Sequence, residues 1–406
     1  MIGRSLGSIF LRFLIFGFFA WGGPVAQIAM LRKELVEKEK WVSKTRFNHA
    51  LALYQVLPGP EATEMAVYFG YKRGGLVAGL LAGLGFVLPG FFLMLLLSWA
   101  YVYWGAAWLS VVFLGVQPAV AALVARATVQ LSKHTLTDRH LWALGGVSAA
   151  VSFLGVPFWL TLLFAGVAYF LCKRRQVHLA AGLAVMILLL GSWSVAPTLT
   201  LGLADSSKSG GWWGFLPLLT SPADSTPPVT PSVPELFFSG LKAGLLTFGG
   251  AYTVIPFVQA DAVQSGWLTN GQFLDGLALS GLLPAPLIIF ATFVGFFTGG
   301  WPGALAMSVG IFLPAFAFTL LGHGYLERIV AQPGIRVWLD GITAGVIGLI
   351  AATAIVMFFA AVHGVLGFVL FGLALAALFY VKSKWAVPAV ILTSGVMGLF
   401  ASFLQV

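Results

Sequence analysis

The sequence predicts an all-α polytopic membrane protein, built from two homologous inverted repeats with Gly/Pro-broken re-entrant helices. Two observations predict the membrane class: the 406 residues are 59% hydrophobic, and only 9% are charged, against about 25% in a soluble domain. A third observation predicts the repeats, because Leu57-Pro58-Gly59-Pro60 returns as Leu283-Pro284-Ala285-Pro286. Each proline pair interrupts an apolar helix, which a membrane tolerates only where protein or a water-filled cavity surrounds the break.

The two proline motifs belong to a longer internal repeat with nearly constant spacing. The matched segments are Trp21-Gly22-Gly23 with Phe248-Gly249-Gly250, Trp41 with Trp267, Leu51-Ala52-Leu53 with Leu277-Ala278-Leu279, Gly74-Gly75 with Gly299-Gly300, and Leu88-Pro89 with Leu313-Pro314. Chance similarity between apolar segments does not keep Gly, Pro and Trp in register. Internal duplication of this kind is typical of transporter folds.

The repeats define three predicted parts of the chain. Residues 1–175 form the first transmembrane repeat, and residues 236–406 form the second, inverted one. Residues 176–235 join them through a connecting helix, expected over 179–203, and a linker rich in Ser, Pro and Gly. This linker composition does not form a membrane-embedded helix, so we expect it outside the bilayer.

The distribution of basic residues predicts the inversion. In the first half, basic residues follow the apolar segments at 32–46, 72–73 and 173–175, whereas 243–327 contain no Lys or Arg. Basic residues anchor cytoplasmic loops, so the cytoplasmic side of the first half corresponds to the extracytoplasmic side of the second. Two parallel halves with an accidental gap in charge are the alternative. The net charge of +9 reflects this topology signal, and we expect the lipid bilayer and no nucleic acid as a partner.

Inverted repeats with broken helices predict a substrate site between the halves. Amide donors and the positive dipole end of each helix start after the prolines suit an anion, and glycine pairs let backbone approach it closely. The alternative is that these residues only kink helices for packing, but their recurrence in both halves favours a substrate path. The predicted substrate-binding residues are Gly22, Gly23, Gln55, Pro58, Gly59, Pro60, Gly249, Gly250, Pro284, Ala285, Pro286 and Lys242.

Two acids after the first break, Glu61 and Glu64, are the predicted proton-coupling residues. An acid inside a membrane is a functional candidate by default, although Glu61 also suits a helix N-terminus without any transport role. An ionised carboxylate repels a nearby anion, so protonation can couple the two. Lys242 either snorkels to the interface or faces the cavity as a counter-charge for the anion.

Motifs for soluble catalysis are missing from the sequence. It contains no Walker loop, no HExxH motif and no dinucleotide fingerprint, and its single cysteine, Cys172, rules out a thiolate metal cluster. We therefore expect no enzyme, no cofactor, no metal and no ATP-driven pump. Transport would then be driven by an ion gradient or by the gradient of the substrate itself.

Several motifs of both halves resemble the chromate transporter family in its two-domain form. They are Phe18–Pro24, the basic segment Arg32–Trp41, Leu51–Pro60, Gly70–Gly75, Phe86–Pro89, Leu246–Tyr252, Gly276–Pro286 and Ile311–Pro314. The resemblance implies a multi-pass inner-membrane protein that exports chromate, confers resistance to it and uses the proton motive force. Small polar residues often follow the Pro-Gly-Pro motif in this family, so Glu61 and Glu64 resemble one branch of it.

The leading hypothesis is therefore that the protein is a secondary transporter for chromate. Three alternatives are compared with it. The first alternative is a carrier for sulfate or another oxyanion, since sulfate is also a tetrahedral dianion. A passive anion channel is the second. A membrane-embedded enzyme acting on lipid headgroups is the third, and it would need facing acids or histidines, of which only the Glu61/Glu64 pair is available. The shorter crossings leave room for a homodimer partner.

Overall fold

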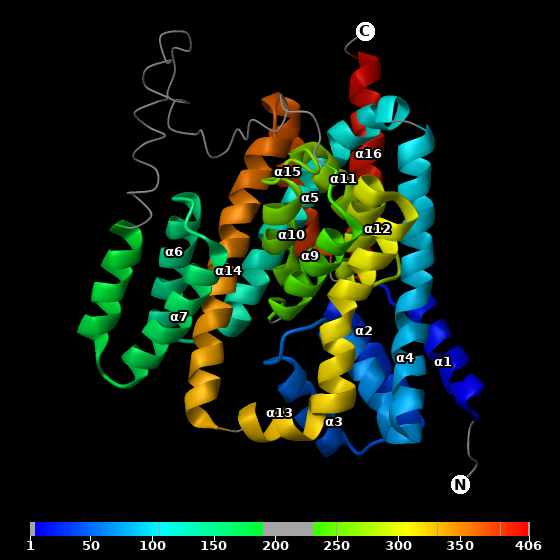
Figure 1. Cartoon of the computed structure of the whole chain (residues 1–406). Coiled ribbons are helices and arrows are strands. Elements are labelled where there is room, and N and C mark those ends of the chain that lie inside the picture. Colours follow the sequence, from blue (N-terminus) through cyan, green and yellow to red (C-terminus); the bar gives the residue numbers. More distant parts are fainter. Residues whose placement is uncertain are drawn as a thin grey trace.

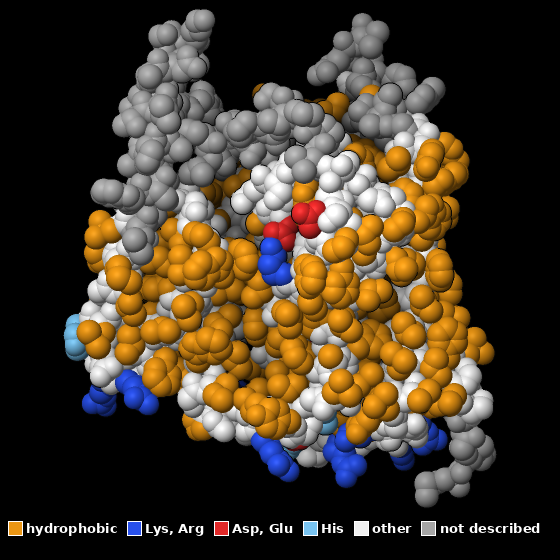
Figure 2. All heavy atoms as spheres, in the orientation of Figure 1, with side chains coloured by type: hydrophobic (Ala, Val, Ile, Leu, Met, Phe, Trp, Pro, Cys, Tyr) orange, Lys and Arg blue, Asp and Glu red, His pale blue; other side chains and the backbone are white. Residues whose placement is uncertain are grey.

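The computed structural model describes residues 5–404, apart from 105, 190–229, 249, 331 and 382, and these residues are almost entirely helical. Four helices are long and apolar enough to cross a membrane: Glu61–Trp104, Val111–Thr135, Leu287–Val330 and Pro333–Ala361. Figure 2 shows a broad apolar surface, with Lys and Arg side chains gathered along its lower edge. This combination confirms a multi-pass, all-α membrane protein.

The first half begins with short segments that precede its long helix. They are α1 (Leu6–Phe18), α2 (Gly23–Leu31), the π-helix η1 (Arg32–Lys38) and α3 (Lys44–Tyr54). The predicted break between α1 and α2 is present, and Gly22 and Gly23 adopt φ angles of 92° and 77° there. Positive φ favours glycine, so this turn depends on the glycine pair.

The long helix α4 (Glu61–Trp104) consists of two limbs that meet at Gly74 and Gly75. Gly75 has φ 77° and ψ −162°, which is not helical. The short limb, residues 61–73, then packs back on the long limb, residues 76–104. A Cβ atom added at Gly70 would lie 2.5 Å from the Ala78 carbonyl oxygen, so the two limbs touch through backbone.

The second half repeats this order of elements. It contains α9 (Val233–Leu245), η5 (Ala251–Val254), α10 (Ile255–Ala262), α11 (Asn270–Gly281), η6 (Leu287–Ile289), α12 (Phe290–Ala317), the π-helix η7 (Phe318–Gly322) and α13 (His323–Val330). Helix α12 bends at Gly299 and Gly300, as α4 bends at its glycine pair. In Figure 1, α3 lies at the lower end of the molecule and α11 at the upper end.

Further helices complete each half. They are α5 (Ala106–Thr135), α6 (Arg139–Phe153), α7 (Phe158–Lys173), a helix over Val177–Leu189, α14 (Pro333–Ala361), α15 (Gly364–Tyr380) and α16 (Ala386–Leu404). Where a connecting helix is expected over 179–203, the structure has a helix over Val177–Leu189, and residues 190–203 of that expected range lie outside the described residues. Most of the predicted linker also lies outside them, and α9 begins at Val233, inside the expected linker range.

Glycines pack the first helix of each half against the long helix. A Cβ atom at Gly85 would lie 2.7 Å from the Phe10 carbonyl oxygen, and one at Gly310 would lie 2.3 Å from that of Phe237. Small residues allow this close approach between membrane helices. Gly85 and Gly310 occupy equivalent repeat positions, as do Phe10 and Phe237, so the duplication extends from sequence to packing.

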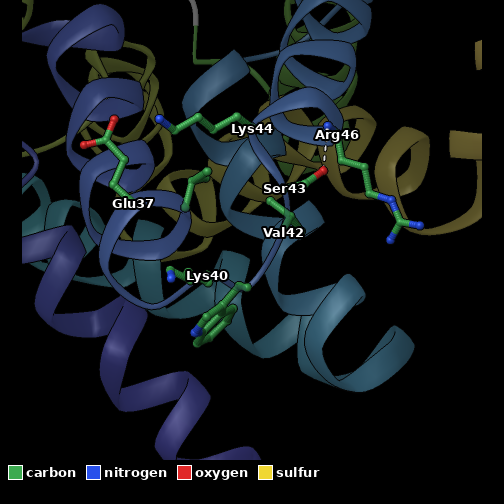
Figure 3. Close-up of a pocket in the computed structure, with 8 residues that line it drawn as sticks. Glu37, Lys40, Val42, Ser43, Lys44 and Arg46 are labelled. Atoms are coloured by element: carbon green, nitrogen blue, oxygen red, sulfur yellow. Dashed lines mark hydrogen bonds between the residues drawn. The ribbon is translucent and has the colours of Figure 1, made fainter.

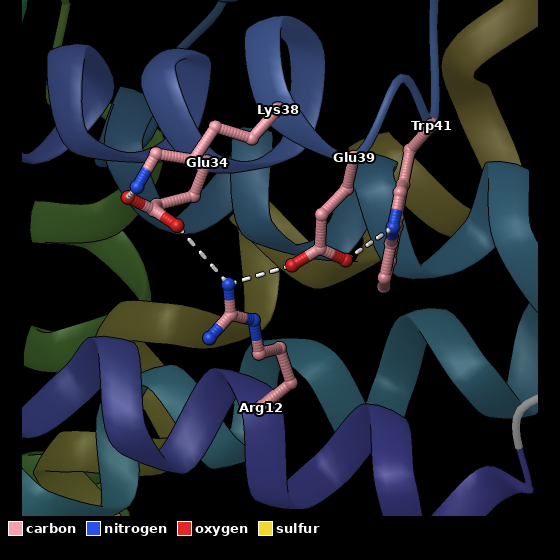
Figure 4. Close-up of polar contacts among 5 residues, drawn as sticks. All are labelled: Arg12, Glu34, Lys38, Glu39 and Trp41. Carbon is pink, nitrogen blue, oxygen red and sulfur yellow. Dashed lines mark hydrogen bonds and ion pairs between the residues drawn. The ribbon is translucent and has the colours of Figure 1, made fainter.

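An ionic cluster ties α1 to the surface segment η1 (Figure 4). Arg12 Nη2 lies 2.6 Å from Glu39 Oε1 and 3.2 Å from Glu34 Oε2. Lys38 Nζ contacts the other Glu34 oxygen at 2.7 Å, and the Trp41 indole donates to Glu39 at 2.8 Å. The two hydrogen bonds of this guanidinium hold the basic segment against α1.

Asp138 organises the start of α6, outside the membrane-spanning segments. Its carboxylate accepts hydrogen bonds from the amides of His140 and Leu141, both at 3.0 Å. Tyr169 and Lys173 of α7 donate to it at 2.8 Å and 2.9 Å. Burial acts to raise the pKa of Asp138, but the bonds from Lys173, Leu141 and Tyr169 outweigh it and hold that pKa below its usual range.

Asp138→Asn is expected to flatten the acid side of the stability profile. A depressed carboxyl pKa contributes stability above the unfolded-state value of about 4, and this stability is lost as the pH falls through the folded-state pKa. We expect the wild-type melting temperature to drop between pH 5 and pH 3 more steeply than that of the variant. Equal slopes in detergent would contradict the assignment.

Gly240→Ala is expected to destabilise the packing of α9 on α12. The new Cβ atom would lie 2.4 Å from the Met307 carbonyl oxygen, and overpacking of this kind costs about 1–3 kcal/mol. Gly372→Ala in α15 is the control, because nothing lies within 4 Å of its Cβ position. Thermal unfolding should show a lower midpoint for the first variant alone, and a shared shift would refute the packing explanation.

Candidate functional site

The first proline break inserts against the second half of the protein. The Gly59 N–H donates a 2.7 Å hydrogen bond to the Thr247 carbonyl oxygen, and Pro58 forms an isolated antiparallel bridge with Phe248. Gly59 has φ 146°, and a Cβ atom on it would lie 3.4 Å from Ala315 of α12. The structure therefore brings the predicted residues 58–60 beside the segment that leads into the second glycine motif.

The second proline break has equivalent neighbours but different backbone pairing. Pro284, Ala285 and Pro286 are all buried, and the Ala285 side chain packs against Gly90 of α4, 2.4 Å from that glycine's Cβ position. Gly90 and Ala315 are equivalent repeat positions, so each break contacts the long helix of the other half. The Ala285 N–H, however, bonds to Leu283 within its own turn at 2.9 Å.

The two predicted acids are buried beside the first break. Glu64 is 0% exposed and Glu61 is 8% exposed. Glu64 Oε1 lies 2.8 Å from the Cβ position of Gly59, and neither carboxyl oxygen of Glu64 has a hydrogen-bonding partner. Burial of an unsatisfied carboxyl group costs several kcal/mol, so a group kept in this state is a strong functional candidate.

The helix start after the first break offers fewer free donors than an isolated helix would. The amides of Thr63 and Glu64 both bond to the Pro60 carbonyl oxygen, at 2.8 Å and 3.1 Å. The equivalent start in the second half is the 3-10 turn η6, in which the Ile289 N–H bonds to the Pro286 carbonyl oxygen at 3.0 Å. The N–H groups of the residues that directly follow each break precede these bonds in the sequence. They are therefore the donors that a ligand could use.

The other predicted substrate-binding residues have separate surroundings. Gly22 contacts Lys384, whose Cα lies 3.1 Å from the glycine's Cβ position, and Trp21 packs on Trp385 with ring centroids 4.6 Å apart. Gln55 is exposed at the end of α3. Gly249 lies outside the described residues, while Gly250 adopts φ 124°.

Lys242 is paired, an arrangement that neither sequence interpretation included. Its ammonium group forms an ion pair with Asp261 of α10, and the same carboxylate accepts a 2.6 Å hydrogen bond from Ser239. Asp261 and Ser239 occupy the repeat positions of Glu34 and Arg12. The pair thus holds α9 to α10, and the charge of Lys242 is compensated within the protein.

Sequence reasoning missed two polar contacts that join the halves. Asp275 of α11 is buried and accepts hydrogen bonds from Tyr101 and Gln117, at 2.8 Å and 2.9 Å. Tyr54 of α3 and His323 of α13 form the other contact, with Oη and Nδ1 3.1 Å apart. An acid inside the apolar 271–290 segment was the available signal for Asp275, whereas the partners are too distant in sequence to be recognised.

A basic hollow of about 870 Å³ lies between η1 and α3. Lys40, Lys44 and Arg46 line it, with Glu37 as the acidic neighbour, and Figure 3 shows their side chains around the connection between the two helices. A basic concave surface attracts anions and raises their local concentration. The hollow therefore favours anions at this end of the molecule.

Residues 7–191 and 234–399 match a protein family described as "Chromate transporter". The chain belongs to the chromate transporter family. A "Chromate transport protein" from Pseudomonas aeruginosa is 49% identical over 401 residues, which cover 97% of this chain and 92% of that protein. One from Cupriavidus metallidurans is 32% identical over 358 residues, 87% of this chain and 82% of the relative.

Membership of the chromate transporter family confirms the resemblance found in the sequence. A "Probable chromate transport protein" from Synechococcus elongatus is a further relative, 29% identical over 400 residues. No solved structure matches the chain. The family and these relatives are transport proteins by name, so this member of the chromate transporter family is a membrane transport protein and not an enzyme.

A double-mutant cycle on Lys242→Met and Asp261→Asn is expected to show coupling of about 0.5–3 kcal/mol. Each single variant leaves one charge uncompensated, while the double variant removes both. The exposed Arg32–Glu37 pair, at 46% and 45% exposure, provides the control cycle, with coupling of about 0–1 kcal/mol. If unfolding measurements gave equal coupling for both pairs, Lys242 would be free to act as a counter-charge.

Proposed function

We propose that this protein is a secondary active transporter that exports chromate across the inner membrane, coupled to protons, by alternating access between two inverted repeats. The observation that carries the proposal is the junction of Gly59 with Thr247, where a broken helix of one half meets the other half. The buried carboxyl group of Glu64, without a partner, lies at this junction. Transporters with repeats bind substrate at such helix breaks.

The proposed substrate follows from the relatives and from the chemistry of the breaks. The relatives from Pseudomonas aeruginosa and Cupriavidus metallidurans are named for chromate transport. Backbone amides at the starts of α4 and η6 suit a tetrahedral oxyanion, and the basic hollow at Lys40 and Lys44 would supply it from the basic end of the protein. Sulfate has the same shape and charge, so it is the competitor that the experiment includes.

The proposed repeats comprise residues 1–175 and the segment from 236, with its first helix starting at Val233, to 406. Their inversion is supported by the opposite placement of the equivalent helices α3 and α11 in Figure 1. The Lys and Arg side chains along one edge in Figure 2 support a cytoplasmic location of that edge. In this topology α3 and residues 61–73 form a re-entrant hairpin, and α11 with the start of α12 forms its counterpart.

Alternating access is supported by the unequal state of the two breaks. Gly59 pairs with Thr247 across the halves, whereas the equivalent Ala285 pairs with Leu283 in its own turn. Homologous repeats that adopt different pairings suggest two conformations related by exchange of their roles. We infer that transport moves the protein between these two conformations.

Proton coupling is proposed to depend on competition at Glu64. An ionised Glu64 would repel a chromate dianion at the adjacent break, and a protonated one would not. The carboxyl group and the anion therefore change their occupancy together. Exchange of protons for chromate follows when each occupant binds from its own side of the membrane.

Glu64→Gln is expected to lose chromate flux driven by a pH gradient. The test compares proteoliposomes of wild type, Glu64→Gln and the control Glu235→Gln under both polarities of gradient, because Glu235 is exposed and Gln also suits its capping box at the start of α9. Removal of an essential proton-transfer group reduces rates by about 100-fold or more, so only the first variant should fail. Sulfate is added as a competitor in each case.

Three results would contradict parts of the proposal. Sulfate flux without chromate flux would change the substrate and leave the architecture intact. Chromate flux that ignores the gradient would support a passive channel. Gradient-driven flux by Glu64→Gln at the wild-type rate would remove this acid from the coupling.

A further inference from the structure

We propose that Tyr54 and His323 relay protons between the basic end of the protein and Glu64. The inference rests on the proposed function, because it explains how a proton reaches a carboxyl group that is 0% exposed. The three side chains come from α3, α13 and α4. His323 belongs to the second half and the other two to the first, so the relay crosses between the halves.

The central step is the contact between Tyr54 and His323. Tyr54 is 0% exposed, and its hydroxyl lies 3.1 Å from His323 Nδ1. The Tyr68 ring lies 6.0 Å from the Tyr54 ring and 5.1 Å from the imidazole, between centroids. These aromatic contacts fix the hydroxyl and the imidazole at a distance suited to direct proton transfer.

The inner step joins Tyr54 to Glu64. The Tyr54 ring packs on Tyr68 with centroids 6.0 Å apart, and Tyr68 lies one turn after Glu64 on the same face of α4. Neither Glu64 oxygen has a hydrogen-bonding partner, so the inner step runs through one bridging water or a rotation of either side chain. The titratable groups around Glu64 are Glu61, three residues earlier in the first turn of the same helix, and Tyr54 of α3. The Thr319 hydroxyl of η7 is also buried without a partner.

The outer step joins His323 to solvent at the basic end. His323 is partly exposed at the start of α13, and Glu327 is exposed one turn later. The charged groups that act on the imidazole are Lys72 of α4 and Glu327 of α13, and Tyr54 and Tyr68 complete its surroundings. An acid next to an exposed imidazole edge is suited to deliver protons from water.

The transfer balances without any further reactant. A proton from solvent binds His323 Nε2, the Nδ1 proton passes to Tyr54 Oη, and the original Tyr54 proton passes to the bridging water, which gives one of its own protons to the Glu64 carboxylate. The imidazole and the hydroxyl end neutral, and Glu64 ends protonated. Rotation of the imidazole and of the hydroxyl restores the starting arrangement.

The second polar contact between the halves, at Asp275, differs from the contact between Tyr54 and His323. Asp275 is also buried, but its two oxygens each accept a hydrogen bond, from Tyr101 and from Gln117. A fully bonded carboxylate holds α11 against α4 and α5 and has no free oxygen aimed at a partner. Of these two buried acids, Glu64 is the one whose oxygens have no hydrogen-bonding partner, so the relay through Tyr54 and His323 is assigned to Glu64.

The test measures two fluxes in proteoliposomes containing the full-length protein. One is chromate uptake driven by a pH gradient, and the other is chromate-for-chromate exchange at equal pH, which needs no net proton transfer. Tyr54→Phe and His323→Gln are compared with two control variants at exposed residues, Tyr103→Phe and His363→Gln.

We expect Tyr54→Phe and His323→Gln to lose gradient-driven uptake by about tenfold or more, while exchange falls by less. Both control variants should match wild type. Added imidazole should restore uptake in His323→Ala.

Each other outcome overturns a defined part of the inference. If both fluxes fall together and imidazole restores neither, the two residues hold the fold and no relay exists. If neither flux changes, protons reach Glu64 by another route. If wild type itself moves chromate without protons, the proposed coupling fails together with the relay.

Discussion

The structure depends on one constraint, which is that backbone polar groups inside a bilayer need partners within the protein. The proline motif around Gly59 cannot satisfy its backbone by helix formation. It does so across the molecule, through the bond from Gly59 to Thr247. The position of the first break is therefore set by the second half, and the same contact fixes where Glu64 lies.

Glycine makes this arrangement sterically accessible. The limbs of α4 and α12 fold back at glycine pairs, and α1 and α9 touch those helices through backbone at Gly85 and Gly310. Hydrophobic burial between helices gives little driving force in lipid, so such close van der Waals packing carries more of the stability. The equivalent use of glycine in both halves explains why the repeat remains recognisable among apolar residues that vary freely.

Local features of the fold and the site were predictable from the sequence. The glycine and proline breaks, the helical class and the burial of Glu61 and Glu64 follow from rules that act within a few residues. Long-range pairings were not predictable, because nothing in the pattern links Lys242 to Asp261 or Tyr54 to His323. The position of Lys242 in an apolar helix left open whether it snorkels to the interface or acts as a counter-charge for the anion, and the structure adds an ion pair with Asp261. The positions of the two proline breaks against the opposite halves likewise depend on tertiary contacts.

The bond between Gly59 and Thr247 also bears on how the chain is made. The ribosome synthesises the first half well before Thr247. During that time the Gly59 N–H lacks the carbonyl group that accepts its hydrogen bond in the complete protein. The first half on its own is therefore an incomplete assembly with an unsatisfied donor at its centre. Two halves produced as separate polypeptides would satisfy this donor only on association.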